Sequence, residues 1–176
     1  RPILESLGKV TFAGKVGSAR ALDYAVVDLA MANYLSHCAN LAMLERDGRW
    51  LLQLRDDIDG IVHPGTWALF GGHLDPGETA EQALVRELKE EIDWDSPPLP
   101  AWFVHRNSVR IAHFFRGKLT SPLEQLQLLE GQDMVLAPLE EIRTGQVWSP
   151  RRQTFRSLSP SLQRALQELE LEHRLH

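Results

Sequence analysis

Cysteine is nearly absent from this sequence, since Cys38 is the only one among 176 residues. A single cysteine forms no intrachain disulfide, so the chain carries no sign of the disulfide framework on which many secreted domains depend. No continuous apolar core of a signal peptide is present either. We therefore expect a reducing, cytoplasmic setting.

Long hydrophobic runs and an excess of positive charge are also missing. The most apolar stretch, "ALDYAVVDLAMANYL", is interrupted by Asp23, Asp28 and Asn33, and no run of about 18 apolar residues exists to cross a bilayer. The 24 acidic residues outnumber the 19 basic ones, for a formal charge of −5. This balance argues against a broad surface for nucleic acid or anionic membrane. A phosphate-bearing ligand would need a metal ion or a few placed arginines.

The length and the composition, with 43% apolar and 24% charged residues, fit one globular domain with short extensions. We expect an N-terminal extension over residues 1–36 and the main domain over 37–176. An amphipathic helix is predicted from about residue 18 to 35, because apolar residues recur there at helical spacing. This helix is suited either to cover its own sheet or to pack on a partner subunit in a homodimer.

The central part of the chain alternates strand and helix signals. Two apolar runs flank Asp47-Gly48, a dipeptide that supplies the positive φ angles of a tight hairpin. After a loop rich in glycine and proline, Thr79 and Gln82 form a capping box that opens a helix. Pro97 and the prolines after it stop that helix.

The second half of the chain continues the mixed pattern. We expect two strands in "AWFVHRNSVRIAHFFRGKL", a strand that runs into a helical turn in "DMVLAPLEEI", and a helix that opens at Ser159-Pro160. Strands on both sides of one strongly marked helix predict a mixed α/β domain.

Three acids on the central helix, Glu87, Glu90 and Glu91, stand close enough to repel one another. On a helical wheel, Glu87 and Glu91 fall at the rim of the apolar arc, and Glu90 lies one step further out. Partly desolvated acids need a proton or a cation. Arg86 and Lys89 are expected to point the other way, so they would not neutralise all three. A hard divalent cation such as Mg²⁺ would, although an acidic helix face in solvent is the alternative.

The acids belong to a longer pattern that resembles the Nudix hydrolase family. Its signature positions are filled, at the required spacing, by Gly72, Glu78, Arg86-Glu87, Leu88, Glu90-Glu91 and Trp94. One position departs, because Asp93 stands where the family has glycine. That glycine closes the helix in a left-handed conformation, which Asp is among the few residues to tolerate.

The resemblance covers roughly residues 38 to 143, since "RWLLQLRD", "WALFGGHLDPGE" and "EGQDMVLAPLEEI" also look like the family's pattern. The fold that it implies is α/β, a Nudix-type α/β/α sandwich with a mixed sheet between helices. The activity that it implies is a pyrophosphohydrolase, which cleaves the diphosphate linkage of a nucleoside diphosphate joined to another group such as a sugar or ribose.

Roles for single residues follow from the resemblance. Glu87, Glu90 and Glu91 would hold a divalent metal, Mg²⁺ or Mn²⁺, together with the backbone carbonyl of Gly71. One of these acids, or Glu130 in the later loop, would deprotonate the attacking water.

Structural roles in the motif fall to Gly72, Glu78 and Arg86. Arg86 would pair with Glu78 and so hold the loop against the helix.

Substrate-binding residues are less clearly marked. Arg55, at the end of the hairpin, is a candidate phosphate ligand, and a surface salt bridge with Asp56 or Asp57 is its alternative. Trp67 is a candidate for stacking on a base, although aromatic residues on strands are more often part of the core. The same choice applies to Phe70, Phe114 and Phe115, while Arg110 and His113 are candidates for the cleft.

The sequence leaves the substrate open within a class of small nucleotides. Two alternatives to the diphosphate-linked substrate remain: a housecleaning pyrophosphatase of damaged nucleoside triphosphates, and a Nudix module that senses a nucleotide without cleaving it. The complete set of Glu87, Glu90 and Glu91 favours an enzyme, since a pure binder has no need of a strained acidic cluster.

Overall fold

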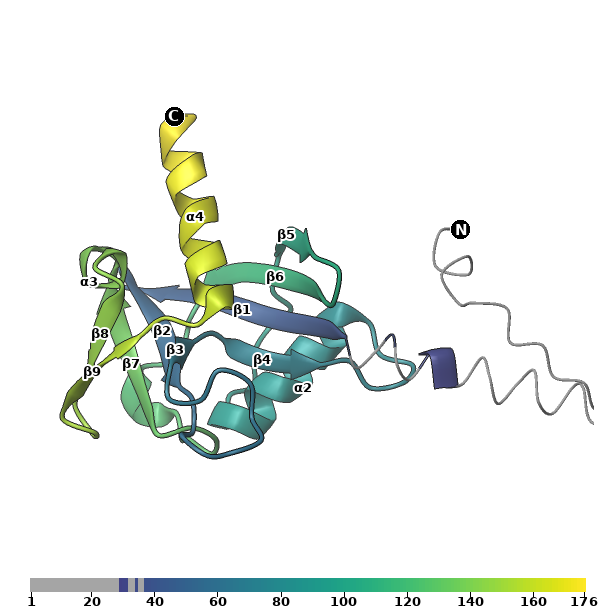
Figure 1. Ribbon diagram of the computed structural model, residues 1–176, viewed down its shortest axis with the longest axis horizontal. Helices are drawn as coiled ribbons and strands as arrows, with labels where there is room; N and C mark the ends of the chain where they lie inside the picture. Colours follow the sequence, from purple (N-terminus) through teal and green to yellow (C-terminus); the bar gives the residue numbers. More distant parts are fainter. Residues whose placement is uncertain (1–28, 32–33, 35–36) are drawn as a thin grey trace, which may run out of the picture. The chain divides into compact units, whose positions relative to one another are not determined.

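The computed structural model describes residues 29–31, 34 and 37–176 of the chain (Figure 1). Residues 29–31 and 34 are helical, and the rest of the helix predicted over 18–35 lies outside the described residues. The division into an extension over 1–36 and a domain over 37–176 stays a prediction. Within the described residues, no helix is long and apolar enough to cross a membrane.

A mixed sheet forms the middle of the domain. Its seven strands are β1 (Cys38–Arg46), β2 (Arg49–Leu54), β3 (Trp67–Ala68), β4 (Phe70–His73), β5 (Ala101–Arg106), β6 (Ile111–Lys118) and β7 (Asp133–Pro138). The main order is β3-β2-β1-β6-β5, with β4 paired to β1 and β7 to β2. The pair β1–β6 is parallel and the other pairs are antiparallel. The predicted hairpin is confirmed: β1 and β2 are joined at Asp47 and Gly48, which have φ angles of 52° and 75°.

Helices cover both faces of this sheet, which confirms the predicted α/β/α sandwich (Figure 1). Successive residues of a strand point to opposite faces, and β1 uses this alternation. Leu41 and Met43 pack in the core under α4 (Pro160–Arg174), whereas Ala42 and Leu44 pack in the core against α2 (Ala80–Ile92).

The C-terminal helix follows the sequence pattern as well. Ser159 caps α4, since its side chain accepts a hydrogen bond from the Leu162 N–H, and Pro160 occupies the first turn. Leu162, Ala165 and Leu169 are buried at helical spacing. This buried stripe packs α4 against one face of the sheet.

A second hairpin, β8 (Gln146–Ser149) with β9 (Thr154–Ser157), was not among the predicted elements. It follows the short helix α3 (Leu139–Arg143) and lies at the edge of the domain (Figure 1). A buried carboxylate anchors it, because Asp133 accepts hydrogen bonds from the Ser149 hydroxyl at 2.6 Å and from the Arg151 N–H at 3.1 Å. This anchor joins residues far apart in the sequence, so no local pattern predicts it.

Both ends of α2 behave as the sequence indicates. The Thr79 side chain accepts from Gln82 N, and the Gln82 side chain accepts from Thr79 N, so the capping box is complete. At the other end Asp93 adopts the left-handed conformation, with φ 51° and ψ 41°, and its N–H donates to the Leu88 and Lys89 carbonyls. Asp93 thus occupies the conformation for which the family uses glycine.

Substitution of Asp93 tests how much this helix end depends on a left-handed residue. Asp93→Val should lower the free energy of unfolding by about 1–2 kcal/mol, because a β-branched residue is strained at positive φ. Asp93→Gly should leave it unchanged or raise it slightly. Urea denaturation measures both, with Asp95→Val as the control, since Asp95 is an exposed neighbour that shares the Lys89 contact. Equal stability of Asp93→Val and Asp95→Val would contradict this account.

Candidate active site

A cavity of about 580 Å³ gathers most of the predicted site residues, and we call it the active-site cavity. Predicted residues that line it are Arg55, Gly71, Gly72, Glu87, Glu91, Arg110 and Glu130. They come from the residue after β2, from β4 and α2, from the turn before β6 and from the loop before β7, so the fold brings together residues between positions 55 and 130 of the chain. Glu90 and Trp67 are not among the lining residues.

Glu91 is the most unusual residue of this cavity, because its carboxyl is buried without a paired cation among the described residues. It is 4% exposed, and its Oε2 accepts a hydrogen bond from the Gly71 N–H at 3.0 Å. Burial, with the nearby carboxylates Glu130 and Glu87, raises the pKa of Glu91 to about 9, against the weaker opposing effects of the Gly71 N–H and Arg55. At neutral pH the metal-free site therefore holds a protonated Glu91.

The other two acids of the helix are less buried. Burial also raises the pKa of Glu87, against the opposing hydrogen bond from Arg86. The Glu90 side chain is 58% exposed and pairs with Arg86 at 3.2 Å. Burial of the three carboxyls thus increases from Glu90 through Glu87 to Glu91.

Arg86 corrects one expectation from the sequence. It was expected to point away from the acids, yet its guanidinium contacts Glu87 at 2.9 Å as well as Glu90. A helical wheel locates the start of a side chain, whereas the long arginine stem carries its charge back over the neighbouring turn. Lys89 does point away, since it pairs with Asp93 at 2.8 Å.

The pair expected between Arg86 and Glu78 is present. Two hydrogen bonds join them, from Nε to Oε1 at 2.6 Å and from Nη2 to Oε2 at 3.0 Å. Glu78 also accepts from the Asp75 N–H, and Arg86 donates to the His73 carbonyl, so one guanidinium ties the loop before α2 to the helix. The Arg86 hydrogen bonds lower the pKa of Glu78.

The two glycines of β4 let the chain pass close to its neighbours. At Gly71, where φ is +148°, a Cβ atom would lie 1.8 Å from the Asn40 carbonyl oxygen of β1. At Gly72, a Cβ atom would lie 2.3 Å from the carboxyl carbon of Glu87. Only glycine fits at position 71, because β4 passes so close to the backbone of β1. Glycine at position 72 leaves room for the Glu87 carboxyl.

Within the part of the chain that the structure describes, no three His, Cys, Asp or Glu side chains are grouped tightly enough to hold a metal ion. Glu87 and Glu90 are instead paired with Arg86, at 2.9 and 3.2 Å. Carboxylates are nevertheless the ligands that Mg²⁺ and Mn²⁺ prefer, and the buried Glu91 carboxyl needs a proton or a cation. The residues present therefore fit a hard divalent cation once Glu87 or Glu90 exchanges Arg86 for the metal.

Basic groups line the active-site cavity as well. Arg55 donates from Nε to the Val62 carbonyl at 2.8 Å, and the salt bridge of Asp57 is made with Arg156 rather than with Arg55. Arg110 also lines the cavity, and burial together with Arg55 lowers the pKa of Arg110. Ser159 and Ser161, at the N-terminus of α4, also line the cavity, and a helix N-terminus favours anions.

The aromatic candidates require a correction. Trp67 is 0% exposed and its Nε1–H donates to the Val147 carbonyl at 2.8 Å, so its ring cannot stack on a base. Phe70, Phe114 and Phe115 are likewise buried in the core. Helices cover both faces of the sheet that carries these rings, which the alternation of a single strand does not reveal. His113, another candidate for the cleft, is not among the lining residues, and burial lowers its pKa.

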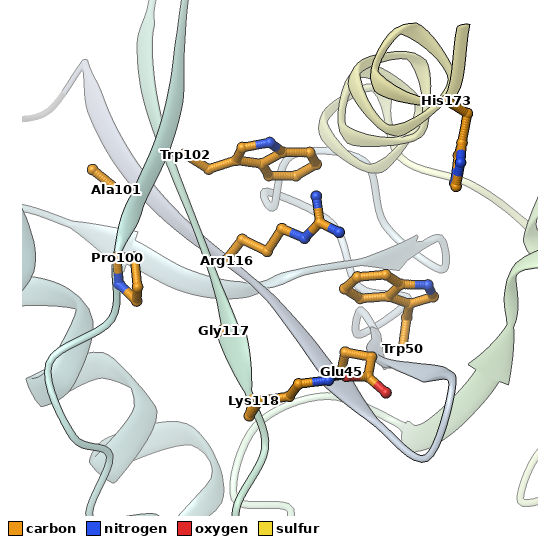
Figure 2. Close-up of a pocket in the computed structure, with 9 residues that line it drawn as sticks. All are labelled: Glu45, Trp50, Pro100, Ala101, Trp102, Arg116, Gly117, Lys118 and His173. Carbon is orange, nitrogen blue, oxygen red and sulfur yellow. Dashed lines mark hydrogen bonds and ion pairs between the residues drawn. The ribbon is translucent and has the colours of Figure 1, made fainter. Parts of the chain in front are cut away.

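A separate cavity of about 630 Å³ lies near the other ends of β1 and α4 (Figure 2). Figure 2 shows the Arg116 guanidinium between the indoles of Trp50 and Trp102, at 5.5 and 5.3 Å from their centres. Arg116 pairs with Glu172 at 2.6 Å, and Lys118 pairs with Glu45. These opposite charges are therefore matched with one another, in contrast to the buried acid of the active-site cavity.

Comparisons with known proteins point to one family. The family model described as "NUDIX domain" matches residues 37–158. The nucleoside triphosphatase NudI of Escherichia coli O1:K1 / APEC is 48% identical over 50 residues, which are 28% of this chain and 35% of NudI. The chain thus spans about a third of the length of the curated relatives that it matches.

Solved structures share the fold. The MutT NUDIX hydrolase from Burkholderia pseudomallei superposes with a TM-score of 0.59 and 20% identity, over 76% of this chain and 97% of that one. The E. coli ORF135 protein gives a TM-score of 0.54 and 29% identity, over 78% of this chain and 89% of that one.

Because the Glu91 carboxyl is buried, we predict that the free energy of unfolding of the metal-free protein depends on pH. The pKa of this carboxyl rises from an ordinary value of 4.5 to about 9, so folding must bind a proton between these values, and stability falls as pH rises through that window. Glu91→Gln lacks this dependence. Between pH 5.5 and 8 in EDTA, the variant should gain about 1–3 kcal/mol over the wild type in urea denaturation.

Glu81→Gln serves as the matched control, since Glu81 is an exposed acid of the same helix. If the free energies of unfolding of the wild type and Glu91→Gln differed by the same amount at every pH, burial would not be the cause of the raised pKa of Glu91.

Proposed function

This chain belongs to the NUDIX family, and on that premise we propose that it hydrolyses the diphosphate linkage of a small nucleotide with a divalent metal ion. The observation that carries the proposal is that one cavity contains both acids and arginines. Glu87, Glu91 and Glu130 line it together with Arg55 and Arg110. A metal-bound nucleotide presents a cation to the acids and phosphate oxygen atoms to the arginines, so it matches both kinds of group.

The metal would be held by Glu87, Glu90 and Glu91, with the Gly71 carbonyl, and Mg²⁺ or Mn²⁺ suits such oxygen ligands. When bound, it supplies a water molecule of lowered pKa and neutralises charge on the phosphate oxygens. The buried Glu91 carboxyl supports this assignment, because it has no ion-pair partner among the described residues and carries a proton in place of a cation.

The remaining steps fall to the protein's own side chains. Glu130 is exposed at the cavity wall and close enough to Glu91 to raise its pKa, so it is a candidate base for the attacking water, alongside the acids of α2. Arg55 would bind the diphosphate and orient it. Arg86 would keep its bidentate contact with Glu78 and so hold the loop in place while Glu87 or Glu90 turns to the metal.

The substrate that we propose first is a nucleoside diphosphate linked to another group. The NudI match favours a second candidate, a nucleoside triphosphate, because that relative is named a nucleoside triphosphatase. Both candidates contain the diphosphate bond that the cavity suits. Neither requires nucleic acid or a membrane.

Glu91→Gln is the decisive variant for this proposal. With Mg²⁺ or Mn²⁺, the wild type should release phosphate or nucleotide products from a panel of nucleotide sugars, ADP-ribose, dinucleotides and nucleoside triphosphates, and EDTA should abolish this activity. Glu91→Gln should lower kcat/KM by roughly 100-fold or more, because even residues that only support a metal ligand cost about 10–100-fold.

Glu81→Gln should keep the wild-type rate in the same assay. Near-normal turnover of Glu91→Gln would remove Glu91 from the metal site. Tight nucleotide binding without any hydrolysis by the wild type would replace the enzyme with a nucleotide-sensing module.

A further inference from the structure

A smaller cavity of about 360 Å³ adjoins the active-site cavity, and we call it the side cavity. The two cavities share lining residues, among them Val62, Val109, Arg110 and Ser161. The side cavity extends from these residues to Arg164 on α4. A ligand that fills the active-site cavity can therefore continue into it.

Two arginines of the side cavity hold buried nitrogen atoms without a hydrogen-bond partner among the described residues. These atoms are Nε of Arg110 and Nη1 of Arg164. Buried donors in folded proteins are nearly always satisfied, because an unmade hydrogen bond leaves the cost of desolvation uncompensated. Two unmet donors on cationic groups in one cavity therefore point to an acceptor that binds there.

Arg110 is held in place by its own turn. The Asn107 side-chain oxygen accepts from the Arg110 N–H at 2.8 Å and from the Val109 N–H at 2.9 Å, and the Asn107 N–H donates to the Arg110 carbonyl. The next residue, Ile111, starts β6. These hydrogen bonds fix the backbone from which the Arg110 side chain extends. They also occupy the Asn107 side-chain oxygen, so it is not the acceptor for the Arg110 Nε.

Arg164 is fixed by three other contacts. Its Nη2 pairs with Glu168 at 2.9 Å, its Nε lies 3.4 Å from the Nδ1 of His105, and its guanidinium carbon lies 4.7 Å from the centre of the Phe103 ring. These contacts occupy two of its nitrogens and one face. The third nitrogen, Nη1, is the one left without a partner among the described residues.

The residues that line the side cavity favour an anionic ligand. No Asp or Glu is present among its described lining residues, which include two histidines and two arginines. Pro160 and Ser161 add the N-terminal end of α4, the positive end of the helix dipole. A ligand rich in acceptors and negative in charge meets all of these groups, and a phosphate monoester is such a ligand.

We propose that Arg110 and Arg164 bind a terminal phosphate of the substrate, separate from the diphosphate bond that is cleaved. The preferred substrate is then a nucleotide that carries a phosphomonoester beyond its diphosphate. The inference rests on the proposed function in one respect, which is that the diphosphate occupies the active-site cavity.

Arg116 provides a matched control for Arg164. Each guanidinium lies over an aromatic ring and pairs with a glutamate of α4, Glu172 for Arg116 and Glu168 for Arg164. Arg116 has no unmet buried nitrogen within the described part of the chain, and it lines the separate cavity in Figure 2. If the loss of any arginine that pairs with a glutamate of α4 changed binding, both Arg164→Gln and Arg116→Gln would show the change.

The experiment compares matched pairs of nucleotides that differ by one phosphomonoester: NADP and NAD, and coenzyme A and dephospho-coenzyme A. Calorimetric titration in EDTA gives Kd for each, and assays with Mg²⁺ give kcat/KM. We expect the wild type to prefer the phosphorylated member of at least one pair by about tenfold or more. Arg110→Gln and Arg164→Gln should each reduce that preference to about twofold or less, while Arg116→Gln retains it.

Equal affinity for both members of every pair would overturn the proposal, as would a preference that survives both glutamine variants. Arg164→Lys, which keeps the charge and the apolar stem, replaces Arg164→Gln where circular dichroism shows that the latter is unfolded, and it should lose at least part of the preference. Hydrolysis without any preference would overturn the side-cavity assignment alone. A preference in Kd without hydrolysis of any nucleotide would overturn the proposed function alone.

Discussion

The burial of the Glu91 carboxyl is the constraint on which the site is built. The helix that carries Glu91 also buries Leu84, Leu88 and Ile92 against the sheet, so the acid cannot leave the interior without loss of the core. The Gly71 N–H donates to that carboxyl, and it lies within reach because β4 runs close against β1, where a side chain would collide with Asn40. A close backbone approach and an apolar helix face therefore combine to hold an acid where water does not stabilise its charge.

Arg86 makes this arrangement tolerable in the absence of a metal. Its guanidinium meets Glu78, Glu87 and Glu90, and these contacts raise its pKa, so it stays charged under all ordinary conditions. The repulsion among the acids is thus reduced by Arg86 at Glu87 and Glu90, and at Glu91 it is relieved by a proton.

The sequence predicted the parts of the structure that local chemistry decides. The Asp47-Gly48 turn, the Thr79 and Gln82 capping box and the left-handed Asp93 each depend on a few neighbouring residues, and all three are present. The sequence did not predict the buried position of Trp67, because the two helices that cover its sheet come from distant parts of the chain. It also missed the β8–β9 hairpin, whose anchor Asp133 lies 16 residues from Ser149. The reach of Arg86 was misjudged because a wheel diagram contains no side-chain length.

The same distinction between local and distant causes applies to the candidate site. Glu87, Glu90 and Glu91 stand on one helix at fixed spacing, so the sequence predicts that they lie close together. The cations of the site do not share an element: Arg55 follows β2, Arg110 precedes β6 and Arg164 lies on α4, and only the folded sheet with α4 on its face assembles them. A chain with a net charge of −5 can therefore still offer cations to a phosphate. Arg110 and Arg164 line the side cavity, which has no acid among its described lining residues, whereas Glu87, Glu91 and Glu130 line the active-site cavity together with Arg55 and Arg110. Burial strengthens the field of these charges.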